Sequence, residues 1–338
     1  MPREALERLR DSGEVDAETR AAIDHTIEID ALQRKIRGLQ ASVMRKSTLL
    51  ATSAPLTMLA AAPAVRVYDC KQTTVLPGNP VANPGSSADA TAKRAHDITD
   101  DVAKFYATCF GRNSVDGGGG ALNSSIHYDV KYNNAFWNGV QMVYGDGDGQ
   151  VFIDFTGSDD VIGHELTHGV TQYTAALAYT NEAGGLNESM SDVFGTMFRQ
   201  WRKTQDVKSA DWLIGAGIMG PKAKAAGYTC LRDLSNPGAK HVLSKQPKHY
   251  SQYVPNGDPH LNSGIPNHAF YQAAMKLGGR SWEKLGKVWY NALTGGKTSK
   301  TMGFAKFASL TRAAAKALFA SDPKVYAAVD GGWKAVGL

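Results

Sequence analysis

The first forty residues carry a helical pattern of apolar positions. Leu6 and Leu9 mark one short helix, and Gly13 follows it where the end of a helix favours glycine. A second helix is predicted by apolar residues at three-, four- and five-residue steps, namely Ile23, Ile27, Leu32, Ile36 and Leu39. Two such helices bury too little surface to be stable alone, so they need the rest of the chain as a partner. We therefore expect residues 1–43 to form a helical prosegment.

The pattern changes after this helical pair. Residues 44–66 are rich in Ala, Pro, Ser and Thr, which is typical of a linker that a protease can enter. From residue 67 short β-like runs alternate with Pro-Gly turns, and residues 87–110 form a predicted helix with Ser86 or Ser87 as its N-cap. Further strands are predicted at 125–132, 141–144 and 150–155.

From about Asp159 the pattern is mainly helical to the end of the chain. This layout predicts an α+β fold, with a mixed, β-rich domain over residues 67–178 and a helical domain over residues 179–338.

Composition and charge narrow the function. The chain has 338 residues, 43% of them hydrophobic and 20% charged, as in ordinary globular proteins. Its formal net charge is +5, but Lys and Arg form no basic stripe interleaved with aromatic residues, so we expect no nucleic-acid partner. No run of 18 apolar residues occurs, so we expect no membrane span. The three cysteines form no CxxC pair and are expected to be small buried thiols.

One stretch inside the linker allows a second interpretation. Met44-Arg45-Lys46 and the apolar residues after it resemble a secretory signal peptide, although such a peptide belongs at an N-terminus. A chain that begins at Met44 is therefore an alternative to the linker.

An HExxH motif, His164-Glu165-Leu166-Thr167-His168, lies within an apolar stretch. On a helix the two histidines are about one turn apart, so both rings leave the same face and can bind one metal ion. Glu165 lies beside them, where it can polarise a metal-bound water. The motif also occurs by chance in roughly one per cent of chains this long, and two core histidines would give the same pattern.

The third ligand distinguishes these alternatives. A catalytic zinc takes three protein ligands and keeps one open position. Thr171 and Thr174 replace the Gly and His of the metzincin pattern, which excludes that class. Within Gly184–Asp192, Glu188 can supply the ligand from a following helix, and Asp192 can accept the second ring proton of a ligand histidine. A Glu and an Asp four residues apart more often lie on a solvated face, but the adjacent glycines and apolar residues favour burial.

These residues resemble the thermolysin family of zinc metallopeptidases. Other stretches carry the same resemblance: Asn133–Asn138, Met142–Gly149, and Asn262–Asn267. The resemblance extends from about Val67 to the C-terminus, and the short helical prosegment is similar to the protealysin branch, without the Pro-Pro motif usual there. It implies a two-domain gluzincin with one catalytic Zn²⁺ in a cleft between the domains. It also implies a secreted, self-processed precursor that acts on proteins and peptides.

The resemblance assigns roles as well. Glu165 would deprotonate the zinc-bound water that attacks the scissile carbonyl. Other implied roles are oxyanion stabilisation by His260 and Tyr179, binding of the substrate backbone by Asn134 and Ala135, and a grip on a substrate carbonyl by Arg232. The specificity pocket would be lined by Phe152, Val161, Ile214 and Leu231. This implies a preference for a bulky hydrophobic residue just after the cleaved bond.

The sequence departs from the family pattern beside the catalytic histidine and near the zinc. Pro255 replaces the aspartate that orients the histidine, and we expect Asp258 to take over that role. Asp160 and Asp211 match two acids of the family's double calcium site, but three others are replaced, by Arg199, Leu213 and Ala216. We therefore expect this calcium site to be absent. Arg199 would pair with Asp160 or Asp211, or else point to solvent.

A rival hypothesis is a catalytically inactive zinc-binding relative that acts as a binding protein. Because every catalytic position that can be aligned is retained, the enzyme is the favoured interpretation. A purely structural zinc site is disfavoured, since such sites usually fill the fourth position with protein.

Overall fold

The computed structural model describes residues 3–13, 15–48 and 62–338, and only the backbone of residues 33–48. Its helices are α1 (Arg3–Asp11), α2 (Ala17–Thr48), α3 (Ala90–Phe110), α4 (Asp159–Gln172), α5 (Asn181–Arg202), α6 (Pro221–Ala225), α7 (Pro259–Asn262), α8 (Gly264–Leu277), α9 (Leu285–Thr294), α10 (Phe304–Leu318) and α11 (Pro323–Ala335). Its strands are β1 (Val65–Thr73), β2 (Asn79–Pro80), β3 (Leu122–Tyr128), β4 (Ala135–Trp137), β5 (Met142–Tyr144), β6 (Leu213–Ile214) and β7 (Arg232–Asp233).

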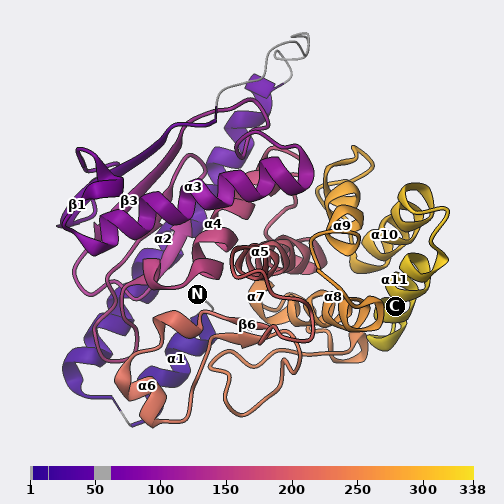
Figure 1. Cartoon of the computed structure of the whole chain (residues 1–338). Helices are drawn as coiled ribbons and strands as arrows, with labels where there is room; N and C mark the ends of the chain where they lie inside the picture. Colours follow the sequence, from indigo (N-terminus) through magenta and orange to yellow (C-terminus); the bar gives the residue numbers. More distant parts are fainter. Residues whose placement is uncertain (1–2, 14, 49–61) are drawn as a thin grey trace.

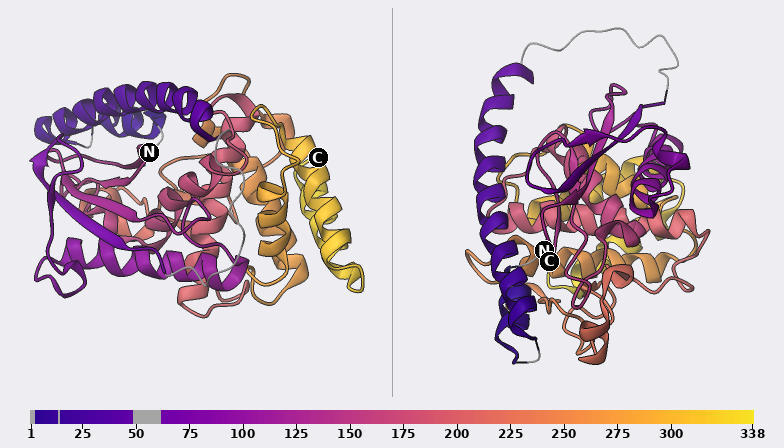
Figure 2. Two further views of the ribbon diagram at one scale, coloured as in Figure 1. Left: turned by 90° about the horizontal axis from the view of Figure 1, so that it is seen from above. Right: turned by 90° about the vertical axis from the view of Figure 1, so that its left-hand side faces the viewer.

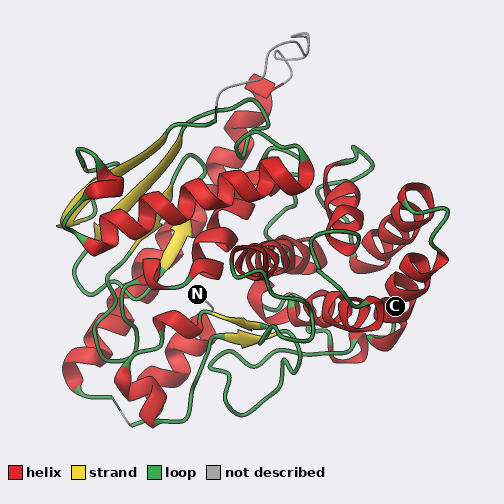
Figure 3. Ribbon diagram, viewed as in Figure 1, coloured by secondary structure: helices red, strands yellow, loops and turns green. Residues whose placement is uncertain are grey.

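The N-terminal half contains one five-stranded sheet, which Figure 3 shows apart from the helical half. Its strand order is β2-β1-β3-β5-β4. Strands β1, β3 and β5 run parallel, and the two outer strands, β2 and β4, pair antiparallel with their neighbours. Strand β4 is therefore an edge of the sheet.

The two faces of the sheet bury different sets of residues, as the alternation of side chains along a strand requires. On one face Trp137, Met142 and Tyr144 join the main core together with α3 and α4. On the other face Phe136 and Val143 form a smaller cluster that Ile29 of α2 partly covers. The sheet accordingly lies between α3 and α2, as the views in Figure 2 show.

Helix α5 lies at the centre of the molecule, between the sheet-containing half and the C-terminal helices (Figure 1). Its buried residues belong to the same core as those of α4 and of α8 to α11. The rings of Trp289 and Trp333 stack 6.0 Å apart and join α9 to α11. Within the described ranges, no helix combines the length and the apolar composition that a membrane crossing requires.

Several predicted boundaries were wrong for local reasons. Helix α3 begins at Ala90 because the carboxylate of Asp89, rather than Ser86 or Ser87, accepts the first backbone N–H groups. The strand predicted at 150–155 does not form, because Oδ1 of Asp148 accepts the backbone N–H groups there and bends the chain. Strand β3 ends at Tyr128, four residues before the predicted end, and Asp129 after it has a left-handed φ of 57°.

The prosegment forms the two predicted helices, and Gly13 follows α1 with a left-handed φ of 73°. Helix α2 continues to Thr48, past the expected end at residue 43. Ile23 and Ile27 are buried as predicted, but Leu32 is 53% exposed, so the predicted apolar stripe is wrong there. Asp30, two residues earlier, is buried instead. The side chains of Ile36 and Leu39 lie outside the described residues.

Candidate metal centre and active site

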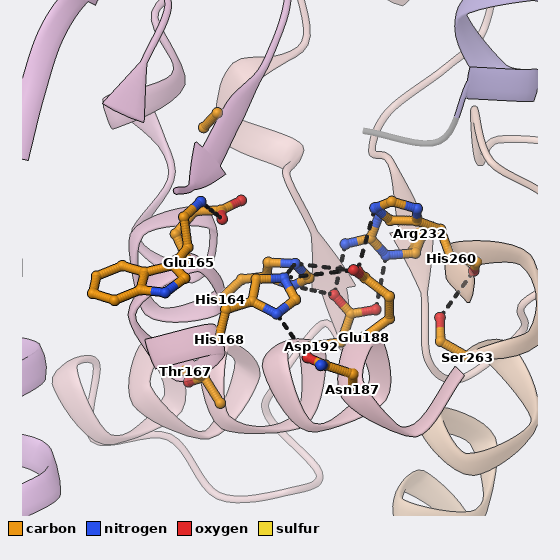
Figure 4. A network of polar contacts seen from close by, with 12 residues as sticks. His164, Glu165, Thr167, His168, Asn187, Glu188, Asp192, Arg232, His260 and Ser263 are labelled. Carbon is orange, nitrogen blue, oxygen red and sulfur yellow. Dashed lines mark hydrogen bonds and ion pairs between the residues drawn. The ribbon is translucent and has the colours of Figure 1, made fainter. Parts of the chain in front are cut away.

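Two glycines allow the zinc helix and the following helix to touch. Helix α4 carries the HExxH motif and is buried from Asp160 to Thr171. A Cβ atom on Gly195 of α5 would lie 2.6 Å from the carbonyl oxygen of Asp160, and one on Gly163 would lie 3.1 Å from Cα of Gly195. The backbones therefore cross in contact, which brings the motif on α4 opposite Glu188 on α5 (Figure 4).

His164, His168 and Glu188 converge as the sequence predicts. The Nε2 atoms of the two histidines are 3.1 Å apart, and the Glu188 oxygens lie 3.3 Å from His164 Nε2 and 3.5 Å from His168 Nε2. All three residues are at least 90% buried. Zinc with bonds of about 2.0–2.2 Å in a tetrahedron needs ligand atoms about 3.3–3.6 Å apart. The two nitrogen–oxygen distances fall within this range and the nitrogen–nitrogen distance is slightly shorter, so the three groups are close enough to share this ion.

The hydrogen bond that Nδ1 of each ligand histidine makes determines that Nε2 faces the metal site. Nδ1 of His164 lies 2.9 Å from Oδ1 of Asp192, and Nδ1 of His168 lies 2.9 Å from Oδ1 of Asn187. Because both oxygens only accept, both Nδ1 atoms carry the proton and both Nε2 atoms present lone pairs. The partnership with Asp192 was predicted from the sequence, and that with Asn187 was missed.

The donor set itself calls for a cation. Two ring lone pairs face each other beside the Glu188 carboxylate, whose Oε2 accepts no hydrogen bond from the described part of the chain. An anionic carboxylate and two imidazole lone pairs in one buried place are the ligands that a catalytic zinc takes.

Glu165 lies between the metal ligands and the sheet edge. Its Oε2 accepts the backbone N–H of Trp137 in β4 at 2.8 Å, and the residue is 7% exposed. The sequence predicted the place of Glu165 beside the ligands but not this bond to the edge strand.

His260 and Tyr179 both contact the Glu188 carboxylate. Nδ1 of His260 is 2.7 Å from Oδ1 of Asp258, the contact predicted for the shortened loop. Nε2 of His260 lies 3.4 Å from the Tyr179 hydroxyl, which also donates to Glu188. Burial lowers the pKa of His260, although the charges of Glu188 and Asp258 oppose this. Two contacts that the sequence did not reveal hold the His260 carbonyl, from Gln246 and Ser263.

A small cavity of about 20 Å³ opens beside these groups. It is lined by Asn134, Ala135, Phe155, Val161, His164, Glu165, Ile214, Leu231, Arg232 and His260. Three of the four expected pocket residues are therefore present. Phe152 was wrongly placed: it is fully buried behind the cavity, with its ring 5.6 Å from that of Phe155, which lines the wall instead.

Arg232 lines the cavity and is held by a charged partner. Its Nε and Nη2 donate to the two oxygens of Asp192 at 2.8 and 2.6 Å. Asn267 donates to Oδ2 of Asp192 as well, at 2.8 Å. Asp192 thus joins His164 to Arg232, and burial alone would raise its pKa whereas Arg232 and His164 lower it.

The region where the sequence lacks three calcium-type acids holds a buried ion pair. Nη1 of Arg199 donates to Oδ2 of Asp160 at 2.7 Å, and its Nη2 donates to Asp211. Arg199 is 5% exposed, which excludes the alternative in which it points to solvent.

Comparisons with known proteins agree with this geometry. Family models described as "Thermolysin metallopeptidase, catalytic domain" and "Thermolysin metallopeptidase, alpha-helical domain" match residues 45–172 and 175–338. The chain is 42% identical over 285 residues to Protease PrtS of Photorhabdus sp. (strain Az29), covering 80% of this chain and 76% of that protein. An extracellular metalloprotease of Pectobacterium carotovorum subsp. carotovorum is 42% identical over 283 residues, covering 80% of each.

Among solved structures, the precursor of protealysin, a metalloproteinase from Serratia proteamaculans, superposes with a TM-score of 0.84. Its sequence identity is 37%, and the match covers 100% of this chain and 98% of that one. The similarity therefore includes the helices before the catalytic domains. With its zinc-binding geometry, its two-domain fold and these relatives, the chain belongs to the thermolysin family of metallopeptidases.

Proposed function

We propose that this metalloendopeptidase cleaves internal peptide bonds just before a bulky hydrophobic residue. The observation that carries the proposal is the cavity beside His164, whose apolar walls are Phe155, Val161, Ile214 and Leu231. An apolar side chain after the scissile bond would be buried there, next to the groups that do the chemistry.

Each step of hydrolysis has a residue in reach. When bound, the zinc ion supplies Lewis acidity and makes water a nucleophile near neutral pH. Glu165 takes the proton of the attacking water and later gives it to the leaving amine. Tyr179 and His260, the latter in its imidazolium form with protons on both ring nitrogens, donate hydrogen bonds to the oxyanion that develops on the carbonyl, and Asp258 orients His260 through Nδ1. The substrate backbone pairs with the edge at Asn134 and Ala135, and Arg232 holds a substrate carbonyl.

Residues 1–43 act in this proposal as a prosegment that masks the cleft. The support comes from α2, whose Asp30 accepts hydrogen bonds from the Tyr132 hydroxyl and from the Asn134 amide at 2.7 Å. Oγ1 of Thr26 accepts the backbone N–H of Asn133 at 3.0 Å. The prosegment thus occupies polar groups at the start of the edge strand that a substrate would use.

Self-processing would release this mask. The expected window, residues 44–66, begins in helix α2 and ends in β1, where Val65 and Arg66 are paired with β3. Because proteases cut regular helices and paired strands poorly, we place the cut outside these two elements. The catalytic domains would then be residues 67–178 and 179–338. One relative is named extracellular, which supports secretion of the processed enzyme.

We further propose that the double calcium site is absent. Arg199 lies between Asp160 and Asp211, and it supplies there the positive charge that an ion would otherwise bring.

The test uses the full chain and its Glu165→Gln variant. Peptidase activity should disappear with a chelator and return with zinc. The zinc-loaded Glu165→Gln protein should bind zinc normally, lose about 10²- to 10⁴-fold in rate, and stay full length when pure. Near-normal proteolysis by that variant would contradict the role of Glu165, and equal trimming of both proteins would contradict self-processing. Zinc binding without any turnover by the wild type would favour the inactive relative.

A further inference from the structure

Two walls of the specificity pocket are tied to the same carboxylate. Val161 of α4 and Ile214 of β6 both line the pocket. Asp160 precedes Val161, and its Oδ1 accepts the backbone N–H of Gly215, the residue after Ile214, at 3.0 Å. Asp160 is fully buried. One carboxylate therefore sets the separation between a wall on the zinc helix and a wall that comes from more than fifty residues later in the chain.

Arg199 of α5 holds this carboxylate and the other end of the same segment. Its Nη1 bonds to Asp160 at 2.7 Å, and its Nη2 bonds to Asp211. Oδ1 of Asp211 accepts the backbone N–H of Leu213, just before Ile214, at 3.1 Å. The guanidinium thus fixes the pocket segment on both sides of Ile214. Its planar fork can reach two carboxylates at once, which a lysine ammonium on a flexible stem does less well.

The third wall moves with the same segment. Gly215 has a left-handed φ of 70°, and a Cβ atom there would lie 2.7 Å from side-chain carbons of Leu231. The carbonyl of Ile214 accepts the backbone N–H of Leu231 at 2.9 Å. A shift of residues 211–215 therefore displaces both Ile214 and Leu231 relative to Val161.

We propose that Arg199 is a positioning residue that sets the width of the specificity pocket and thereby the selectivity for the residue after the cleaved bond. The proposal rests on the function proposed above for this pocket. Arg199 does not line the cavity, so its effect falls on the ratio between substrates more than on the rate common to all of them. One methylene in an apolar pocket changes kcat/KM by roughly 10- to 200-fold, so a loosened wall should have a measurable effect.

The experiment compares two peptides that differ only in the residue after the scissile bond, leucine in one and alanine in the other. The processed, zinc-loaded enzyme is assayed as wild type, as Arg199→Met and as Arg202→Met. Arg202 is the matched control, because it lies on the same helix but pairs with Asp101 and Asp159 rather than with the two carboxylates that hold residues 211–215. We expect Arg199→Met to lower the leucine-to-alanine ratio of kcat/KM by about tenfold, with zinc content unchanged and Arg202→Met near wild type.

Two further variants keep the test valid if Arg199→Met folds poorly, since that change leaves the Asp160 charge buried without a partner. Arg199→Met/Asp160→Asn removes both charges but retains an oxygen to accept the Gly215 N–H. Asp211→Asn changes a carboxylate that is 52% exposed. Arg199→Lys should be intermediate. A lower ratio in the double variant and in Asp211→Asn supports the proposal, and a wild-type ratio in both overturns it. If the wild type itself does not prefer leucine, the proposed pocket specificity fails first and this inference fails with it.

Discussion

The backbone N–H of Trp137 donates a hydrogen bond to Oε2 of Glu165 over 2.8 Å. A second bond, from the Trp137 indole to Oε1 of Gln172 at 2.9 Å, joins the same strand residue to the end of the zinc helix. The sheet edge and helix α4 are thereby fixed to each other at two points. The carboxylate proposed as the base is held in register with the strand that would receive the substrate backbone.

From the proposed role of His260 in oxyanion binding we predict the effect of its substitution on kcat and KM. His260→Ala should lower kcat by about 10²- to 10³-fold and change KM much less, because the charge it would stabilise exists mainly in the transition state. Steady-state kinetics with one peptide measures both constants. A loss confined to KM would mean that His260 only binds substrate.

The orienting role of Asp258 is tested separately by Asp258→Asn. Asn can still accept the backbone N–H of His260, as Asp258 does at 2.8 Å, so the helix cap is kept while the charge is removed. We expect a smaller loss of kcat than in His260→Ala. Unchanged kcat would show that Asp258 does not orient the histidine.

The hydrogen bonds of Asp30 should contribute to the binding of the prosegment to the catalytic domain. Asp30→Ala removes the acceptor of Tyr132 and Asn134, and hydrogen bonds to a charged group contribute about 1.5–3 kcal/mol. The full chain should therefore process itself at least about tenfold faster. Electrophoresis and mass spectrometry measure the rate at which the shorter product appears. Glu28→Ala, an exposed position on the same helix, is the matched control. Equal processing rates for the two variants would rule out Asp30 as part of the mask.

Calcium should have little effect on stability. In the Glu165→Gln background, which prevents self-digestion, the melting temperature should stay nearly constant as calcium rises from trace to millimolar with zinc fixed. Arg199→Glu restores an acid between Asp160 and Asp211 and should make stability depend on calcium. A rise of many degrees without that substitution, or two calcium ions bound beside Asp160, would show the prediction to be wrong.

His127 should make stability depend on pH. Its Nδ1 lies 2.8 Å from Asp146 and its Nε2 lies 2.9 Å from Asp89, the N-cap of α3. The bond to Asp146 raises the pKa of His127 to about 9, burial opposes this, and Asp89 adds to it. The pKa of His127 in the folded state lies above its unfolded value of about 6.5. The imidazolium therefore contributes its full stabilisation of the folded state below pH 6.5, and this contribution is lost as the pH rises through 9.

His127→Asn tests this, since asparagine tolerates the left-handed φ of 50° at that position. In the Glu165→Gln background its melting temperature should be lower than that of the parent by about 2–4 °C near pH 6. The difference should vanish near pH 10. His241→Asn is the control, because the His241 ring pairs with one carboxylate, that of Asp233, among the described residues. A difference that is the same at both pH values would contradict the prediction.

The sequence predicted the metal ligands because their signal is local. His164 and His168 are one helical turn apart, and Glu188 and Asp192 repeat that spacing on the next helix. Asn187 could have been found too, because the second ligand histidine also needs an acceptor for its Nδ1 proton. The bond from Trp137 to Glu165 carries no such signal, since a backbone donor has no residue type.

Other features depended on tertiary packing. Periodicity placed Leu32 in the buried stripe of α2, but the surface that α2 meets is the polar start of an edge strand. Asp30 is therefore buried and Leu32 exposed. Phe152 was expected in the pocket from the family resemblance, but the backbone is bent by its hydrogen bonds to Asp148 and Phe155 lines the pocket instead. The sequence predicted Asp160 or Asp211 as a partner of Arg199. The hydrogen bond from the Gly215 backbone N–H to Asp160 could be seen only in the folded structure.

The contact between α4 and α5 at Gly163 and Gly195 fixes the metal ligands relative to one another but does not include the oxyanion-binding residues. With Gly163 and Gly195 in contact, no side chain separates the helices that carry the three metal ligands at the point where they cross. His260 and Tyr179 lie outside that crossing, on α7 and on the stretch before α5. Any movement of α7 or of the stretch before α5 would therefore shift the oxyanion-binding groups, while the contact between α4 and α5 keeps His164, His168 and Glu188 opposite one another.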